Sequence, residues 1–319
     1  AGVAAEAGVA VRMRDTTDEA VGRGLAYVRG GLEERRQRGS LSRLDLGKRM
    51  DRISAATDLS GFRRTDLVIE AVFEDLDLKR RVLAEVEAVT REECVFASNP
   101  SSLPIGEIAR DARRKNCVLG MHFFSPVAKM PLLEVIVTPD TDAWATATAV
   151  ACGRRLGKHV IGVRDGPGCF TTRALSPYLN EATRLVEEGV SVDEVDRALT
   201  SFGFPVGPLA LLDEVGIDVG AKVAKVLHHN FGERMAPPAG MARVLEDGRQ
   251  GRKNQRGFYI YDGKKKRVDE SVYALLPGRQ ARPCEPREIR ERLVFAFLNE
   301  AVLCLEEGIL RHPRDGDVG

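Results

Sequence analysis

Residues 66–98 read DLVIEAVFEDLDLKRRVLAEVEAVTREECVFAS, and this stretch decides the fold. It starts as an apolar strand at 66–71, takes on helical spacing over 78–89, and returns to strand character at 94–98. Further strands are expected at 9–14, 117–121, 132–137 and 159–163, and helices at 105–109 and 143–156. Alternation of this kind is typical of an α/β fold with a parallel, doubly wound sheet.

The composition changes at residues 164–168, RDGPG, and the signals that follow are helical. Ser191 and Glu194 have the spacing of a capping box, which predicts the start of a helix just after Gly189. We therefore predict a Rossmann-like domain followed by all-α structure. The expected boundaries are 1–164 for the NAD-binding domain, 165–262 for a first helical domain, 263–284 for a linker, and 285–319 for the start of a second helical domain.

One internal repeat supports the last of these boundaries. Residues 179–190 read LNEATRLVEEGV and residues 298–309 read LNEAVLCLEEGI, at a constant offset of 298 − 179 = 119. Chance similarity of two amphipathic helices is the alternative, but a match without a gap favours a duplicated helical domain. The helix expected over 289–310 is apolar around most of its circumference. We therefore expect an exposed apolar patch on it, and self-association of the chain.

Composition excludes several classes of function. The 319 residues carry 48 basic and 47 acidic side chains, a net charge of +1, which gives no electrostatic footprint for nucleic acid. No apolar run is long enough for a transmembrane segment, and no secretory signal opens the chain. The six cysteines are scattered and the five histidines lack metal-ligand spacing, so we expect free thiols in a reducing compartment and no metal.

Asp15 is the first candidate for cofactor binding. In a Rossmann unit, an acidic residue at the end of the second strand binds the ribose of NAD, about 20 residues beyond the Gly-rich turn. Asp15 ends the strand expected at 9–14, so the glycine fingerprint is expected before residue 1, with residues 1–8 as the tail of the next helix. Capping of a helix by Asp15 is the alternative. An acidic residue here favours NAD over NADP.

Three segments near the ends of expected strands carry the candidate catalytic residues. Ser101 follows the strand at 94–98, His122 lies in GMHFFSP at 120–126, and Glu134 lies on the next strand. Ligands of open α/β sheets collect at the carboxyl ends of strands. A histidine beside two phenylalanines is often only a core residue. Together with a carboxylate and hydroxyls on neighbouring strands, however, it has the pattern of a general base with an orienting acid.

The motifs in this sequence resemble those of the 3-hydroxyacyl-CoA dehydrogenase family over essentially the whole chain. The narrower similarity is to the dehydrogenase part of multifunctional fatty-acid oxidation α-subunits, where an enoyl-CoA hydratase domain comes first, so we expect a chain cut short at both ends. The motifs are DLVIEAVFED (66–75), SNPSSLPI (98–105), GMHFFSPVAKMPLLEVI (120–136), SFGFPVGPLALLDEVGID (201–218) and GRKNQRGFYIY (251–261).

The resemblance implies NAD-dependent oxidation of (3S)-hydroxyacyl-CoA to 3-ketoacyl-CoA. His122 would be the general base, Glu134 would hold its imidazole, and Ser101 would hydrogen-bond the reacting oxygen. Thr172 stands where the family usually has Asn in a GFxxNR pattern, which puts one substrate contact in question. The implied cofactor contacts are Asp15, Ala71, Glu74, Lys79 and Asn99.

Two other functions remain open at this point. A free-standing 3-hydroxybutyryl-CoA dehydrogenase would need only one helical domain, so the repeat argues against it. A non-enzymatic, crystallin-like structural or binding protein would have no need of His122, Glu134 and Ser101 together. Without its Gly-rich turn, the chain as given could be inactive. The implied partners are acyl-CoA and a thiolase subunit. The bacterial cytoplasm is the expected compartment, with the mitochondrial matrix as the alternative.

Overall fold

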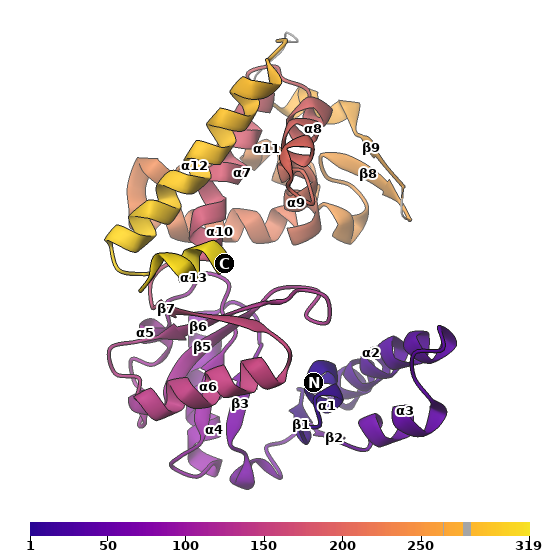
Figure 1. Cartoon of the computed structure of the whole chain (residues 1–319), viewed down its shortest axis with the longest axis vertical. Coiled ribbons are helices and arrows are strands. Elements are labelled where there is room, and N and C mark those ends of the chain that lie inside the picture. The colour runs from indigo at the N-terminus through magenta and orange to yellow at the C-terminus, as the bar shows by residue number, and fades with distance from the viewer. Residues whose placement is uncertain (264, 277–281) are drawn as a thin grey trace. The chain divides into compact units, whose positions relative to one another are not determined.

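The computed structural model describes residues 1–263, 265–276 and 282–319. These residues form two compact units (Figure 1). The first unit comprises Ala1–Pro100, Ile105–Asp165 and Asp317–Gly319, and the second comprises Ser101–Pro104 and Gly166–Gly316. The short loop at 101–104 therefore belongs with the second unit, although its neighbours in sequence belong with the first.

The first unit alternates strands with helices, as the sequence predicts. Its elements are α1 (Gly2–Glu6), β1 (Val11–Arg14), α2 (Asp18–Gln37), α3 (Arg43–Met50), β2 (Ile53–Ala56), η1 (Phe62–Arg64), β3 (Leu67–Glu70), α4 (Leu76–Val89), β4 (Val95–Ser98), α5 (Ile105–Ile108), η2 (Lys115–Cys117), β5 (Val118–Phe123), β6 (Leu132–Val137), α6 (Ala143–Arg155) and β7 (His159–Arg164). The sequence analysis missed strand β2, because ISAA is too short and too polar to stand out, and it did not predict the short 3-10 helices η1 and η2.

The strands form two separate sheets. β1 pairs with β2 in parallel, and the other five strands follow the order β3-β4-β5-β6-β7. In the usual Rossmann order, the strand before the Gly-rich turn lies between these two groups. No strand of the described ranges takes that position. The α/β fold class is thus confirmed, with the sheet divided at this point.

One pair of strands departs from the parallel arrangement that we predicted. β5 and β6 are antiparallel, while β3–β4, β4–β5 and β6–β7 are parallel. The physical reason is the connection between β5 and β6, which runs only from residue 124 to 131. A parallel crossover needs a dozen or more residues, so a segment this short can only reverse the chain. This reversal places residue 122 directly opposite residue 134.

The core of the first unit lies between the sheet and α6. The buried members come from β4, β5, β6 and α6, and are Val95, Ala97, Leu119, Met121, Leu133, Val135, Ala145 and Ala149. These strands read as nearly continuous apolar runs, as expected for strands covered on both faces. The buried polar residues on these strands, Ser98, His122 and Glu134, and Glu70 at the end of β3, are therefore conspicuous.

The second unit is built mainly from helices. Its elements are α7 (Thr171–Glu187), α8 (Val192–Phe202), α9 (Pro208–Val215), α10 (Ile217–Phe231), η3 (Gly232–Met235), α11 (Met241–Glu246), η4 (Arg252–Asn254), β8 (Tyr259–Asp262), β9 (Lys265–Val268), η5 (Glu270–Leu275), α12 (Pro286–Glu306) and α13 (Pro313–Val318), whose last residues belong to the first unit. The predicted capping box is present, because Ser191 accepts from the Glu194 N–H and Glu194 accepts from the Ser191 N–H. None of the described helices is long and apolar enough to cross a membrane.

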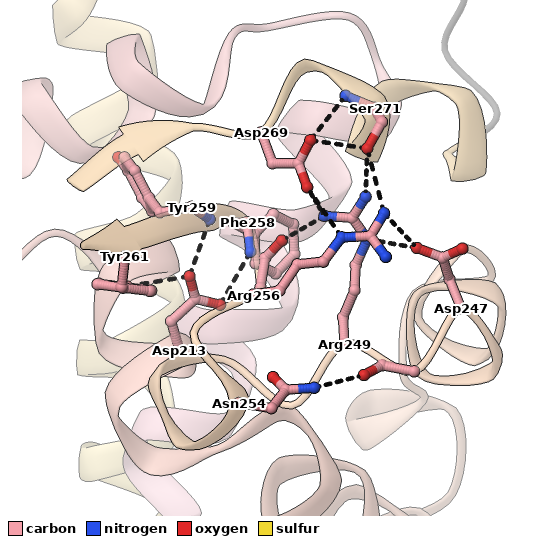
Figure 2. A network of polar contacts seen from close by, with 12 residues as sticks. Asp213, Asp247, Arg249, Asn254, Arg256, Phe258, Tyr259, Tyr261, Asp269 and Ser271 are labelled. Carbon is pink, nitrogen blue, oxygen red and sulfur yellow. Dashed lines mark hydrogen bonds and ion pairs between the residues drawn. The ribbon is translucent and has the colours of Figure 1, made fainter.

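The structure corrects the linker expected over 263–284. Its described part contains β9 and η5, and Val272 and Leu276 are buried in the core of the second unit. Arg249, which is fully buried, donates to Asp269 at 2.7 Å and to Ser271 at 2.6 Å and so fastens this segment (Figure 2). Residues 264 and 277–281 of the expected linker lie outside the described residues.

Helix α12 begins where the sequence analysis expects the start of a second helical domain. Helix α12 packs on α7 and α8, and its Ile289 and Leu293 share one core with residues of α7, α8 and α9. In the described chain, α12 therefore completes the first helical core. The sequence could not show this, because an apolar face fixes that a helix is buried but not which helix it meets.

Asp213 anchors the β8 strand from below (Figure 2). Its carboxylate is fully buried and accepts from the N–H groups of Phe258 and Tyr259, both at 2.9 Å, and from the Tyr261 hydroxyl at 3.0 Å. Burial raises the pKa of Asp213 to about 6, and the two backbone donors oppose that shift. Gly257 leaves the space for this carboxylate, since a Cβ there would lie 1.9 Å from Asp213 Oδ1.

Gly257→Ala is therefore expected to destabilise the second unit by at least about 2 kcal/mol, the upper part of the range for overpacking. The midpoint of urea unfolding, followed by circular dichroism, measures the loss. Gly263→Ala is the control, because a Cβ at Gly263 meets nothing and only its positive φ of 58° opposes the change. Equal losses of stability in the two variants would show that the close approach of residue 257 to Asp213 is not the cause of the destabilisation.

Candidate active site

His122 and Glu134 form the centre of the candidate site. Pairing of β5 with β6 sets the two residues opposite each other, and His122 Nδ1 lies 2.6 Å from Glu134 Oε2. His122 is 8% exposed and Glu134 is fully buried. The His122 ring also packs on the ring of Phe124, at 4.4 Å between centroids. The pair is held rigidly within the sheet, as a base and its orienting group must be.

The contact with Glu134 fixes which ring nitrogen of His122 donates a hydrogen bond and which one can accept a proton. As a carboxylate, Glu134 can only accept a hydrogen bond, so Nδ1 donates and the neutral ring keeps its lone pair on Nε2. Asn99 supports the same strand end, because its side-chain oxygen accepts from the Phe123 N–H at 2.8 Å. This arrangement can take up one proton at Nε2 and stabilise the resulting cation through Glu134.

A buried polar network lies at the carboxyl ends of β3 and β4. Lys79, with no exposed surface, donates to Glu70 at 3.0 Å and lies 3.5 Å from Ser98 and from Glu74. Ser98 in turn donates to Glu70 at 2.7 Å. The sequence analysis named Glu74 and Lys79 but missed Glu70 and Ser98. The signal available was a carboxylate that ends an otherwise apolar strand, since such a charge is buried only when it is paired.

The candidate cofactor residues lie at the ends of strands in the first unit. Asp15 is exposed directly after β1, and Ala71 is exposed directly after β3. Helix capping by Asp15 is excluded, because Thr17 is the residue that accepts from the Ala20 N–H at the start of α2. An exposed carboxylate at the end of a parallel strand fits the ribose of a dinucleotide. These residues therefore fit NAD.

Ser101 and Thr172 both lie in the second unit. The loop at 101–104 is fastened there by the N–H of Gly168, which donates to the Ser102 carbonyl at 3.1 Å. Thr172 is half-buried in the first turn of α7, and its carbonyl accepts from the Ser176 hydroxyl at 2.8 Å. The two predicted substrate contacts are thus carried by neighbouring segments at the start of the helical unit.

Comparison with protein families assigns both halves of the chain. The family model described as the NAD binding domain of 3-hydroxyacyl-CoA dehydrogenase matches residues 1–166, and the model of its C-terminal domain matches residues 168–261. Among curated proteins, the chain is 46% identical to the fatty acid oxidation complex subunit alpha of Vibrio vulnificus over 315 residues, which is 99% of this chain and 45% of that protein. It therefore spans about half the length of the curated relatives that it matches.

Solved structures agree with this assignment. FadB2 of M. tuberculosis superposes with a TM-score of 0.79 at 35% identity and covers 82% of this chain and 93% of that one. The dehydrogenase part of multifunctional enzyme 1 from C. elegans gives a TM-score of 0.65 at 25% identity and covers 97% of this chain and 71% of that one. With both halves matched in order, the chain belongs to the 3-hydroxyacyl-CoA dehydrogenase family of NAD-dependent oxidoreductases.

Proposed function

We propose that this chain oxidises (3S)-hydroxyacyl-CoA to 3-ketoacyl-CoA with NAD, with His122 as the general base. The observation that carries the proposal is the buried pair of His122 and Glu134, with 2.6 Å between Nδ1 and Oε2. A structural or crystallin-like protein would gain nothing from placing an imidazole and a carboxylate inside an apolar sheet, since burying charge is costly.

In this proposal the residues of the chain handle the proton. Nε2 of His122 accepts the proton of the substrate 3-hydroxyl, and Glu134 stabilises the imidazolium that forms. Ser101 donates a hydrogen bond to the reacting oxygen, and Thr172 contributes a second hydroxyl to substrate binding. NAD, when bound, would supply the acceptor for the hydride that leaves C3. The substrate loses one C–H bond at C3 and the O–H bond of its 3-hydroxyl. The products are therefore one ketone, one reduced cofactor and one protonated histidine.

On the cofactor side, we propose that Asp15 binds the adenosine ribose and that Ala71, Glu74, Lys79 and Asn99 line the nicotinamide end. The Glu70 carboxylate holds the Lys79 ammonium at 3.0 Å, which fixes that cation at the end of β3. Glu70 is therefore proposed as a positioning residue for Lys79.

The direct test is NADH formation from (3S)-3-hydroxybutyryl-CoA, with the (3R) isomer as the control. Turnover of the (3S) isomer alone is the expected result. A longer (3S)-hydroxyacyl-CoA in parallel distinguishes a fatty-acid oxidation enzyme from a dedicated 3-hydroxybutyryl-CoA dehydrogenase, the name carried by a 30% identical E. coli structure. If a folded chain that binds NAD produced no NADH from any of these substrates, the proposal would be wrong.

Asp15 should also set the choice between NAD and NADP. Asp15→Ser is expected to lower kcat/KM with NAD by about tenfold, the equivalent of one lost charge-assisted hydrogen bond to the ribose, and to weaken the rejection of NADP. The ratio of kcat/KM for the two cofactors measures the effect. Asp18→Ser on the neighbouring helix is the matched control, and the ratio should not change there.

We further propose that the chain works as part of a larger assembly. Its curated relatives are named as alpha subunits of a fatty acid oxidation complex, which supports acyl-CoA as substrate and a further subunit as partner. We propose that this further subunit is a thiolase. Those relatives are bacterial, and all six cysteines of this chain are free. Both observations support the bacterial cytoplasm as its location. Co-purification of the chain with a thiolase subunit tests the partnership.

A further inference from the structure

The loop at 124–131 connects the strand that carries His122 to the strand that carries Glu134. Its first residue, Phe124, is half-buried and packs its ring on the His122 imidazole, with 4.4 Å between the ring centroids. The remaining residues, 125–131, are all exposed. Burial of its own side chains therefore cannot hold this loop, and with it the Phe124 ring, in one position.

A buried side chain from outside the loop holds it instead. The Lys158 ammonium donates to the carbonyls of Val127 and Met130, the latter at 2.7 Å. The same stretch of the loop forms a turn, because the Met130 N–H donates to the Pro126 carbonyl at 3.1 Å. Lys158 thus joins the two sides of one backbone turn, which begins directly after Phe124 and its exposed neighbour.

The position of the Lys158 side chain is energetically unfavourable in itself. Lys158 is only 9% exposed, and burial lowers the pKa of its ammonium. Within residues 1–263, 265–276 and 282–319, no carboxylate forms an ion pair with it. Two neutral carbonyls offset only part of the cost of burying a cation, and an apolar side chain would fill the space at lower cost. The lysine is therefore better explained by the loop that it holds than by stability.

The backbone of Lys158 is fixed at the end of helix α6. The N–H groups of Gly157 and Lys158 donate to the carbonyls of Arg154 and Gly153, at 2.9 and 3.0 Å. These are the two bonds of a Schellman motif, and the φ of 75° at Gly157 is the left-handed conformation that this motif requires. Lys158 therefore reaches the loop from a backbone position that is itself well determined.

We propose that Lys158 is a positioning residue for the catalytic base. By holding the turn of the loop, it keeps the Phe124 ring against one face of the His122 imidazole. The hydrogen bond to Glu134 fixes Nδ1 but leaves the ring free to tilt about that bond, and packing of Phe124 on its face opposes the tilt. Nε2 then stays directed at the substrate hydroxyl. The inference rests on the proposed role of His122 as the base.

The kinetic test is Lys158→Met, which keeps the length of the side chain and removes its donors. We expect kcat to fall by about 10- to 10²-fold, since a misplacement of about 1 Å can cost that much. KM for NAD should stay nearly constant, because the proposed contacts at Asp15 and Lys79 lie on other elements. Lys129→Met is the matched control, because it removes an exposed ammonium from the same loop and should leave kcat unchanged.

A second measurement reports on the imidazole without turnover. The chain has only five histidines, so NMR of the intact chain with labelled histidine rings gives few signals, and His122→Gln assigns the one from His122. A nearby aromatic ring shifts such a signal. Lys158→Met should therefore move the His122 signal toward its position in Phe124→Leu. The signals of His228, His229 and His312 should not move, which shows that the variant is folded. A lysine that only stabilised the fold would leave the His122 signal in place.

Phe124→Leu also keeps the test decisive if Lys158→Met does not fold. It removes the ring, leaves Lys158 in place, and should lower kcat about as much. The double variant should cost little more than either single one, because both changes act through one ring.

The proposal would be overturned by parental kcat in folded Lys158→Met or in Phe124→Leu, by an unmoved His122 signal in Lys158→Met, or by additive losses in the double variant. If the parent chain formed no NADH, the proposed function would fail, but the His122 signal would still decide whether Lys158 positions the ring.

Discussion

His122→Gln is expected to lower kcat by about 10²–10⁴-fold, the usual contribution of a general base, while KM changes far less. Glutamine occupies similar space and is polar, but its side-chain amide cannot take up a proton near neutral pH. The interaction that is lost exists mainly in the transition state, so the loss falls on kcat and on kcat/KM alike. Steady-state kinetics with (3S)-3-hydroxybutyryl-CoA and NAD measure both quantities.

Two further variants make this result specific. His159→Gln changes an exposed histidine of the same sheet and should keep parental kinetics. Glu134→Gln should cost no more than His122→Gln, and the double variant should cost little more than His122→Gln alone, because Glu134 acts through the imidazole. A His122→Gln enzyme with near-parental kcat would show that the proton leaves by another route.

The first unit could be predicted well because its signals are local. Strand runs such as 66–71 and 132–137 are apolar and short, and the helix at 78–89 has clear amphipathic spacing. The proximity of His122 and Glu134 could be predicted for the same reason. The sequence placed them on consecutive strands, and antiparallel pairing across the short connection then brings them face to face.

Contacts between segments that are distant in the chain could not be predicted from the sequence. Nothing local to Ser98 indicates that its hydroxyl meets Glu70, because that contact depends on the register of β3 against β4. The packing of α12 on α7 is a further example. The repeat showed that the two helices are related, but a pattern along one helix does not identify the helix that packs against it. In the structure, residues of α12 share one core with residues of α7, α8 and α9.

Arg173→Met is expected to destabilise the second unit by about 3 kcal/mol or more, the range for removing one partner of a buried ion pair. The Arg173 side chain is 1% exposed and Glu300 is 3% exposed, so the variant leaves a buried carboxylate without its main partner. Arg234, at 3.6 Å from Glu300, compensates in part and keeps the loss near the lower end of that range. The guanidinium also lies 4.3 Å from the centroid of the Phe231 ring, a contact that methionine retains only as apolar packing.

The internal repeat supplies a matched control for this variant, because Arg292, at the same offset of 119 residues from Arg173, donates to Glu181 and to Glu188 at 2.7 Å each. Arg292→Met removes the equivalent cation from an equivalent pair of carboxylates, but Arg292 is 26% exposed and Glu188 is 37% exposed. Water can solvate the carboxylates that remain, so the expected loss is about 1 kcal/mol or less. Urea unfolding monitored on the second unit measures both. The double variant Arg173→Met, Glu300→Met should recover most of the stability, since an apolar pair can replace a buried ion pair at little cost. Equal losses for the two arginine variants, or no recovery in the double variant, would mean that burial of charge does not govern this interface.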